Sequence, residues 1–449
     1  MRFYLLSLGC PKNLADSEKL TGRLRLAGHR MVSEPEDAEV LMVNTCGFIE
    51  AAKEESIGEI LRLAGTKEDG KKLLVFGCLS QRYAEELRAE LPEVDAIWGV
   101  GADEEIARYL GNAAGPRGGR RRIAPEPLRP STFPYAYLKI SEGCGRRCSF
   151  CSIPLIRGPL SNFGPDEILM EAEGYIRAGI KELILVSQDT ASYSVRGYRL
   201  PDLLKDICRL PGDFRVRLHY LHPSGVDGRL LSAMAGEPKA VKYLDMPLQH
   251  SSPRILKMMS RGGSGEKFKK TISRAREMMP GLAVRTTFIV GFPGESGEEF
   301  EGLLDFIRET AFDHAGAFVY SKEEGTKAAE LPGQVRQGVK KSRWDRLMKA
   351  QAAISLEKNK ALIGREMTAL VDEAEGKIAV GRLESQSPDV DGVTFIKIKN
   401  GNSGIKIKNG NTDGGPTFKA GDFVRVLVAK AYDYDIEAIP VNFNFKGAI

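Results

Sequence analysis

Short apolar runs alternate with longer amphipathic stretches over the first part of the chain. The apolar runs cover residues 2–10, 38–46, 72–78 and 95–100. Between them, apolar residues recur every three or four positions, which is the period of a helix packed on one face. Continuous apolar runs separated by helices are typical of a parallel sheet covered on both faces. Residues 1–111 are therefore predicted to form an open parallel α/β sheet domain.

The alternation stops between residues 112 and 134, where the chain is rich in Gly, Pro and Arg and has no periodic apolar face. Such a composition predicts a linker. The strand and helix patterns resume over 135–345. The apolar runs of this part are 135–141, 182–188, 214–221, 241–248, 283–291 and 314–321. A closed barrel of this type needs eight strand–helix units, so six units predict a partial (βα)6 barrel.

Strand patterns dominate the last part of the chain. Residues 338–362 are predicted to form one helix, of which 346–362 connects the barrel to the next domain. Period-2 patterns follow, and they predict a small antiparallel β-barrel over 363–449. Within it the heptapeptide IKIKNGN occurs twice, at 396–402 and 405–411. Because Asn-Gly between alternating apolar positions is a hairpin signal, the repeat predicts an elongated β-hairpin.

Composition and charge exclude several classes of protein. Hydrophobic residues make up 42% and charged residues 28% of the chain, which are ordinary values for folded domains. No apolar run approaches the ~18 residues that span a bilayer, and the chain begins without the apolar core of a secretion signal. The formal net charge of +5 is too small to indicate nucleic-acid binding by itself. We expect a cytoplasmic protein without membrane contact, whose seven cysteines are reduced and open to metal or redox chemistry.

Three cysteines follow the first predicted barrel strand. Cys144, Cys148 and Cys151 have the spacing C-x3-C-x2-C. Iron–sulfur clusters are held by Cys thiolates, usually four, so three protein ligands leave one iron with an open position, which is the mark of a reactive metal centre. The carboxyl ends of barrel strands are also where such folds place their chemistry. The alternatives are an incomplete zinc site, which lacks the usual second ligand pair, and unrelated core cysteines.

Three further cysteines are far apart in the sequence. Cys10, Cys46 and Cys78 each end a predicted strand of the N-terminal domain. The carboxyl ends of neighbouring parallel strands share one crevice, so these residues are predicted to meet and hold a second cluster. The alternative is three buried core cysteines. Cys208 lies on an amphipathic helix without a partner cysteine and is predicted to be a core residue.

The cysteine pattern with Phe150 directly before Cys151 resembles the radical S-adenosylmethionine signature. Together with the N-terminal cysteines and a C-terminal β-barrel of the TRAM type, it resembles the methylthiotransferases over essentially the whole chain. The motifs most similar to the RimO type of that family are SLGCPKNLADSE at 7–18, SQDTASY at 187–193, YLHP at 220–223, LQHSS at 248–252, GFPGE at 291–295 and YSKEEGT at 320–326. This resemblance implies methylthiolation of the β-carbon of an aspartate in small-subunit ribosomal protein twelve.

The same resemblance implies cofactors and partners. The cofactors are two 4Fe-4S clusters, one on each set of three cysteines, and S-adenosyl-L-methionine. The partners are the ribosomal protein substrate and a low-potential electron donor. Four residues at or near predicted strand ends are expected to line the S-adenosylmethionine pocket, with barrel packing or salt bridging as the alternative role: Phe150, Ser187, Gln188 and Arg217.

Two other functions remain open at this point. One is a transfer-RNA methylthiotransferase acting on a modified adenosine, and the other is a two-cluster electron carrier, for which the chain is large. Residues 364–449 contain 11 Lys and Arg against 12 Asp and Glu. RNA binding depends on neutralising phosphates with basic residues, whereas a near-neutral module suits a basic protein partner. The tail therefore favours a ribosomal protein over RNA as the substrate.

Overall fold

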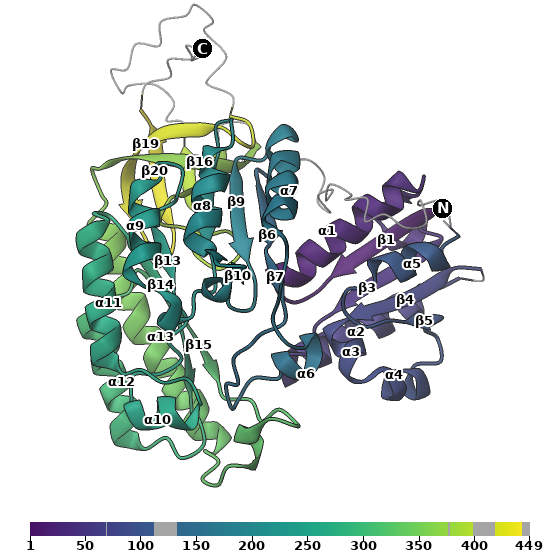
Figure 1. Cartoon of the computed structure of the whole chain (residues 1–449), viewed down its shortest axis with the longest axis horizontal. Coiled ribbons are helices and arrows are strands. Elements are labelled where there is room, and N and C mark those ends of the chain that lie inside the picture. The colour runs from purple at the N-terminus through teal and green to yellow at the C-terminus, as the bar shows by residue number, and fades with distance from the viewer. Residues whose placement is uncertain (69, 112–132, 376–377, 398–417, 442–449) are drawn as a thin grey trace, which may run out of the picture.

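The computed structural model of the chain describes residues 1–449 except 69, 112–132, 376–377, 398–417 and 442–449. Figure 1 shows the N-terminal domain beside a central barrel and a small β-barrel above it. The predicted linker lies almost wholly outside the described residues. The hairpin predicted for the IKIKNGN repeat also lies outside them, apart from Ile396 and Lys397.

The N-terminal domain is a five-stranded sheet in the order β2-β1-β3-β4-β5, and every neighbouring pair is parallel. Its strands are β1 (Arg2–Ser7), β2 (Arg30–Met31), β3 (Val40–Thr45), β4 (Lys72–Gly77) and β5 (Ala96–Ile97). Its helices are α1 (Pro11–Leu26), α2 (Glu50–Gly65), α3 (Cys78–Arg82), α4 (Ala84–Glu90) and α5 (Asp103–Tyr109). Apolar clusters cover both faces of the sheet. The predicted open parallel α/β domain is confirmed.

The central barrel has six parallel strands. They are β6 (Tyr135–Lys139), β9 (Glu182–Val186), β12 (Arg215–Leu218), β13 (Tyr243–Asp245), β14 (Ala283–Val290) and β15 (His314–Val319). The ladders β6-β9-β12 and β13-β14-β15 are joined by a parallel bridge between Val216 and Ala240. Within the described ranges no ladder joins β6 to β15. The predicted partial (βα)6 barrel, open on one side, is therefore confirmed.

Helices cover the outside of the barrel strands. They are α7 (Pro165–Arg177), α8 (Leu200–Arg209), α9 (Gly228–Gly236), α10 (Pro253–Met258), α11 (Gly265–Met278) and α12 (Gly297–Thr310). Alternate strand residues such as Leu138, Leu185 and Leu218 pack against them in the largest apolar cluster. Because side chains alternate along a strand, the residues directly before and after each of these leucines in its strand face the barrel interior. Two of them, Lys139 and Arg217, are charged, whereas Tyr137, Ile184 and Val186 belong to a small apolar cluster, so the interior is partly polar.

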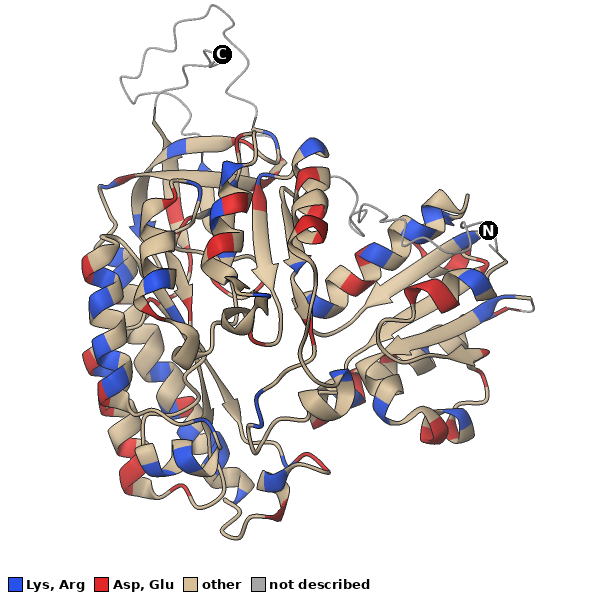
Figure 2. Ribbon diagram, viewed as in Figure 1, with Lys and Arg blue, Asp and Glu red and all other residues tan. Residues whose placement is uncertain are grey.

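A single helix, α13 (Gln337–Lys360), connects the barrel to the C-terminal domain. It contacts β15, α12 and a strand of the C-terminal domain, and its bounds confirm the helix predicted over 338–362. Figure 2 shows Lys and Arg interspersed with Asp and Glu along α11, α12 and α13, so these outer helices carry charges of both signs. Among the residues described, no helix combines the length and the apolar character that crossing a membrane requires.

The C-terminal domain is a closed barrel in the order β16-β17-β18-β20-β19. Its strands are β16 (Glu366–Glu375), β17 (Ile378–Leu383), β18 (Thr394–Lys397), β19 (Phe423–Ala431) and β20 (Ile436–Pro440). The prediction of a wholly antiparallel barrel is wrong in one respect, because β18 and β20 are parallel. Five strands cannot close with every neighbour antiparallel. The strand that the sequence pattern missed, β20, creates the parallel pair.

Candidate functional site

The three N-terminal cysteines follow three adjacent strands, β1, β3 and β4. Gly9 has a φ of +90°, and a Cβ there would lie 2.8 Å from the Cβ and 2.9 Å from the Sγ of Cys46. The turn that carries Cys10 therefore packs directly on Cys46, at an approach that only glycine allows. Cys78 Sγ lies 3.5 Å from the side-chain oxygen of Asn13. The convergence of these strand ends is as predicted.

Asn13 holds the turns of this site together. Its Nδ2 donates to the carbonyl oxygens of Leu8, at 2.9 Å, and Thr45, at 3.0 Å, which belong to the turns before Cys10 and Cys46. The residue is fully buried, so its amide would be costly to leave unpaired. Asn13 thereby fixes the relative positions of the three strand ends.

The thiols of this set differ in how readily they ionise. Burial opposes ionisation of Cys10, but the Lys12 ammonium, the Asn13 N–H and Arg157 outweigh it and lower the pKa of this thiol. Burial raises the pKa of Cys46 and raises that of Cys78 to about 12. The structure therefore favours one thiolate, and a bound metal would displace the protons of the other two.

The second set lies on the loop between the short strand β7 (Ser141–Glu142), which follows β6, and α6 (Ile153–Arg157). The Cys144 N–H donates to the carbonyl of Gly158 at 3.1 Å, and the Cys151 N–H donates to that of Cys148 at 3.2 Å. An Arg261 nitrogen lies 3.5 Å from Cys148 Sγ. Burial raises the pKa of Cys151 to about 12, with neighbouring Cys thiols acting in the same direction. The loop thus presents three closely spaced thiols at the carboxyl end of a barrel strand.

Both sets fit an iron–sulfur cluster better than a single metal ion. Among the residues that the structure describes, no three His, Cys, Asp or Glu side chains are placed to hold one ion. In a cluster each thiolate binds a different iron atom, so the sulfur atoms need not meet at one point. Soft thiolates without an imidazole or carboxylate also suit this chemistry.

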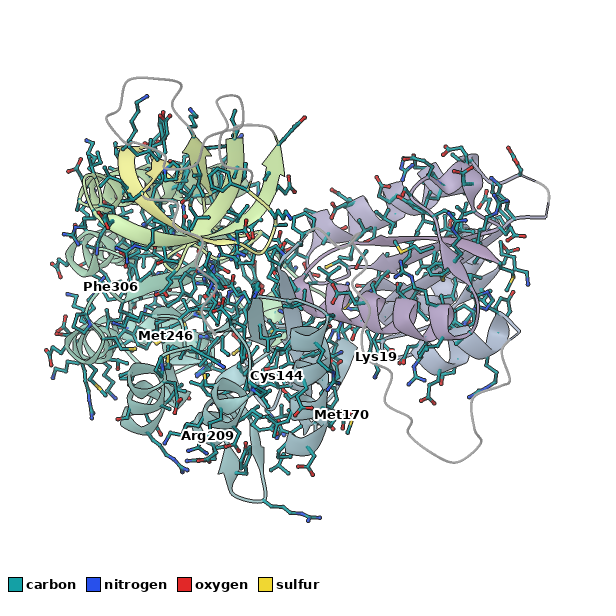
Figure 3. The ribbon with its side chains drawn as sticks, turned by 90° about the horizontal axis from the view of Figure 1, so that it is seen from above. Lys19, Cys144, Met170, Arg209, Met246 and Phe306 are labelled. Carbon is teal, nitrogen blue, oxygen red and sulfur yellow. The ribbon has the colours of Figure 1, made fainter. Side chains whose placement is uncertain are left out.

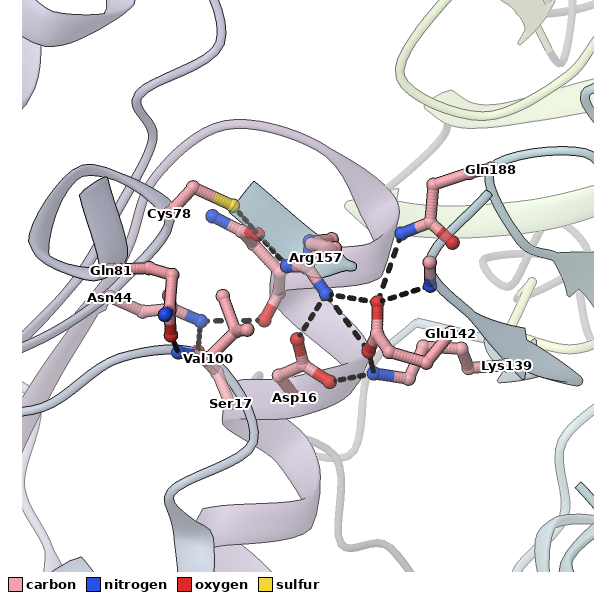
Figure 4. Close-up of polar contacts among 12 residues, drawn as sticks. Asp16, Ser17, Asn44, Cys78, Gln81, Val100, Lys139, Glu142, Arg157 and Gln188 are labelled. Atoms are coloured by element: carbon pink, nitrogen blue, oxygen red, sulfur yellow. Dashed lines mark hydrogen bonds and ion pairs between the residues drawn. The ribbon is translucent and has the colours of Figure 1, made fainter. Parts of the chain in front are cut away.

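Arg157, at the end of α6, connects α1 of the N-terminal domain to Glu142, which lies two residues before Cys144 (Figure 4). Its Nη2 donates to Asn13 Oδ1 at 2.6 Å. Its Nη1 donates to Asp16 at 3.1 Å and to Glu142 at 2.9 Å, and Lys139 binds the same two carboxylates. Although burial opposes it, the positive charge of Lys139 and Arg157 lowers the pKa of Glu142 to about 2. The first turn of α1 is thereby tied to the loop that bears Cys144.

Sequence reasoning missed Arg157 and Asn13. The available signal was their position, since Asn13 lies three residues after Cys10 and Arg157 six residues after Cys151. Arg146, between two cysteines, is a further omission. Its Nε donates to Asp189 at 2.8 Å, which anchors the cysteine loop to the end of β9.

Of the residues expected at the cofactor pocket, Ser187 and Gln188 directly follow the carboxyl end of β9, and Phe150 lies on the cysteine loop. Phe150 is partly buried against the main apolar cluster, beside Cys151. Ser187 Oγ lies 3.3 Å from Thr190 Oγ1. Gln188 donates to Glu142 at 3.1 Å, and its Oε1 is buried without a hydrogen-bond partner in the described part of the chain. An acceptor in this state is suited to a ligand that carries an N–H donor.

The fourth expected residue, Arg217, lies elsewhere, and its assignment to the cofactor pocket is withdrawn. Its Nε donates to Glu182 at 2.6 Å, and its Nη1 donates to the carbonyl of Glu384 in the C-terminal domain at 3.0 Å. Glu182 is the first residue of β9. The guanidinium therefore faces the amino end of the barrel, because a buried cation is held where its carboxylate partner lies. The alternative role, salt bridging, fits these contacts.

Comparison with known proteins places this architecture in a family. The sequence matches the uncharacterized protein family UPF0004 over residues 2–99, the Radical SAM superfamily over 138–307 and the TRAM domain over 363–441. The ribosomal protein uS12 methylthiotransferase RimO of Thermodesulfovibrio yellowstonii is 45% identical over 441 residues, which is 98% of this chain and 99% of that protein. The chain belongs to the RimO family of radical SAM methylthiotransferases.

A second relative agrees with this membership. The RimO protein of Thermotoga maritima is 44% identical over 97% of this chain and 99% of its own length. Membership of the RimO family makes the chain a transferase and removes the electron-carrier alternative.

The solved structures support the fold. The radical S-adenosylmethionine methyltransferase TsrM from Kitasatospora setae superposes with a TM-score of 0.51 at 15% identity, covering 71% of this chain and 74% of that one. At that identity the likeness concerns the fold alone. Figure 3, which labels Cys144 and Lys19, gives the view from above, with the RimO-family barrel on one side and the N-terminal domain on the other.

Proposed function

We propose that this RimO-family chain transfers a methylthio group to the β-carbon of an aspartate in small-subunit ribosomal protein uS12. The observation that carries the proposal is the placement of two three-cysteine sets on one interface. Arg157 contacts Asn13, beside Cys78, and Glu142, beside the loop of Cys144. A reaction that both opens a C–H bond and delivers sulfur needs two such centres next to one substrate position.

The six cysteines would hold the two 4Fe-4S clusters. Cys144, Cys148 and Cys151 would leave one iron open for S-adenosylmethionine, which, when bound there, supplies one-electron chemistry at an unactivated carbon that no side chain performs. Phe150, Ser187 and Gln188 would line the S-adenosylmethionine site, with the unpartnered Gln188 Oε1 as an acceptor for an amino group. The chain's own contribution is to position the groups and to exclude water.

We also propose a division of the chain into a sheet domain over 1–111, a radical SAM domain over 135–345 and a TRAM domain over 363–449, in which the first two domains carry one cysteine set each. A low-potential electron donor is required as a partner, because reduction of the first cluster needs one. The balance of charges over 364–449 supports a basic ribosomal protein as the substrate rather than RNA.

Iron and sulfide counting tests the two-cluster proposal. We expect about eight irons per chain after anaerobic reconstitution, and about four in a Cys10→Ala, Cys46→Ala, Cys78→Ala triple variant. Cys208→Ala is the matched control and should keep about eight, since Cys208 is buried in the apolar cluster of the barrel. About four irons in both the wild type and the triple variant would contradict the proposal.

The substrate is tested in cells that lack this protein. Mass spectrometry should show loss of methylthio-aspartate from protein uS12, with the methylthio-adenosine of transfer RNA unchanged. Loss of the modified nucleoside alone would favour the transfer-RNA alternative and overturn the proposed substrate.

A further inference from the structure

Lys12 is a buried cation whose strongest electrostatic partners include no carboxylate. It lies two residues after Cys10, on the first turn of α1, and is 9% exposed. The groups that act on its charge most strongly are Cys10, Tyr220 and Arg157. Buried charges are normally paired, because removing an isolated ion from water is costly. Lys139, whose side chain in this interface is 12% exposed, follows the rule, with Asp16 and Glu142 as its partners.

The side chain of Lys12 reaches from the N-terminal domain to the barrel. Its Nζ lies 3.6 Å from the centre of the Tyr220 ring. Tyr220 follows the carboxyl end of β12 and packs against the same apolar cluster as Leu14 of α1. The ring and hydroxyl of Tyr220 stabilise this cation, and an ammonium has three N–H donors, so donors remain for a further group. The ammonium is thus held between the N-terminal domain that carries Cys10 and the barrel that carries Cys144.

The local sequence explains why the side chain takes this path. Pro11 fixes the first turn of α1, which begins directly after Cys10. Lys12 therefore leaves the helix beside the cysteine site and not on its solvent face. Lys19, further along the same helix, has a side chain that is 50% exposed and lies near Asp103.

We propose that Lys12 binds the side-chain carboxylate of the substrate and selects an acidic residue at the position that receives the methylthio group. The inference rests on the proposed function, because that reaction places its acceptor carbon between the N-terminal domain and the barrel, and the ammonium lies at that interface. The β-carbon of an aspartate is one bond from its carboxylate. A cation that holds the carboxylate therefore holds the reacting carbon as well.

Binding of two forms of one substrate tests this assignment. The probes are purified protein uS12 and the same protein with its modified aspartate replaced by asparagine. The reconstituted full-length chain should bind the aspartate form about tenfold to a hundredfold more tightly, which is the worth of a hydrogen bond to a charged group. Lys12→Gln should bind both forms equally, and Lys12→Arg should keep a preference because it keeps the charge. Lys19→Gln is the matched control and should behave as the wild type.

The outcomes separate this inference from the proposed function. Equal binding of the two forms by the wild type, or a wild-type preference retained in Lys12→Gln, overturns the role of Lys12. If Lys12→Gln loses iron, the Lys12→Arg variant is the test instead. A Lys12→Arg variant that keeps its iron but no longer prefers the aspartate form would contradict the assignment. If the wild type forms no methylthio-aspartate on the intact protein, the proposed function itself fails.

Discussion

At the residue scale, the same side chain behaves differently according to its neighbours. Cys10 caps α1 beside Lys12 and Arg157, whereas Cys78 is 4% exposed and has a pKa of about 12 because of burial. A helix N-terminus and nearby cations stabilise a thiolate, and burial in apolar surroundings destabilises it. Two ligands of one proposed cluster therefore start from different protonation states.

This difference predicts an order of alkylation in the metal-free protein. Because its pKa is lowered from 9.0, Cys10 carries more thiolate at pH 7.5 than Cys46 or Cys78. We expect iodoacetamide to modify Cys10 first, with a rate that reaches half its maximum below pH 9. Peptide mass spectrometry over a time course measures this order. Equal rates at Cys10 and Cys78 would contradict the electrostatic account.

At the element scale, α1 and α6 are locked together by one guanidinium. Arg157 is 6% exposed and serves Asn13 and Asp16 of α1 and Glu142 of the loop before Cys144. A helix of the N-terminal domain thereby docks on a loop of the barrel. The hydrophobic pattern of neither helix predicts this contact, because Arg157 and Asn13 are 144 residues apart in the sequence.

Replacing Arg157 by Gln is expected to loosen this docking. Removing one partner of a buried ion network costs about 3 kcal/mol or more, so the melting temperature should fall by roughly 5–10 °C. Arg346→Gln is the matched control, because the Arg346 and Glu301 side chains form an exposed pair on the outer helices. Exposed pairs contribute at most about 1 kcal/mol. An unchanged melting curve for Arg157→Gln would show that the interface does not depend on this residue.

At the scale of the whole molecule, the C-terminal domain closes the amino end of the central barrel. The loop after β17 contributes Ser387, whose Oγ lies 2.7 Å from His219 Nε2. The same loop contributes Asp389 and Asp391, which accept hydrogen bonds from Tyr137 at 2.8 Å and Tyr243 at 2.5 Å. These contacts leave the carboxyl end of the barrel, where both cysteine sets lie, as the open end.

Glu182 is the centre of that closure. Its carboxylate is fully buried between Arg215 and Arg217 of β12 and Arg382 of β17. Glu182→Gln should lower stability by about 3–5 kcal/mol, because the guanidinium groups lose their shared countercharge. The variant should unfold at a lower urea concentration than the wild type, and limited proteolysis should release the C-terminal domain first. Wild-type stability in this variant would contradict the central role of Glu182.

His219 makes the same interface sensitive to acid. Burial lowers its pKa to about 4, and Arg217 and Arg285 act in the same direction. In the unfolded chain the pKa of this imidazole is about 6.5. The folded state therefore has its full stability above that pH, where His219 is neutral in both states, and it loses stability as the pH falls towards 4. About 2 kcal/mol should disappear between pH 7 and pH 5. Melting temperatures at both values measure this loss, and His219→Gln should lose less. An equal loss in the variant would assign the acid sensitivity to other groups.

The sequence by itself determined the main strands and helices of the first two domains and the grouping of the cysteines, but not the last strand of the C-terminal barrel, β20. Hydrophobic period is a local property, and in a parallel sheet all strands end at the same edge, so Cys10, Cys46 and Cys78 could be brought together without coordinates. The spacing of Cys144, Cys148 and Cys151 is likewise local. Phe150, Ser187 and Gln188 could be placed at strand ends for the same reason.

Only the tertiary structure decided what the charged side chains contact. Arg217 follows the strand pattern expected of a pocket residue, yet its partner Glu182 draws it to the opposite end of the barrel. Arg157 and Lys12 acquire their roles from contacts across a domain interface. A long, charged side chain can reach in several directions from one backbone position, and its direction is set by the partner that offsets the cost of burial. That partner is fixed by the packing of the domains, which no local pattern records.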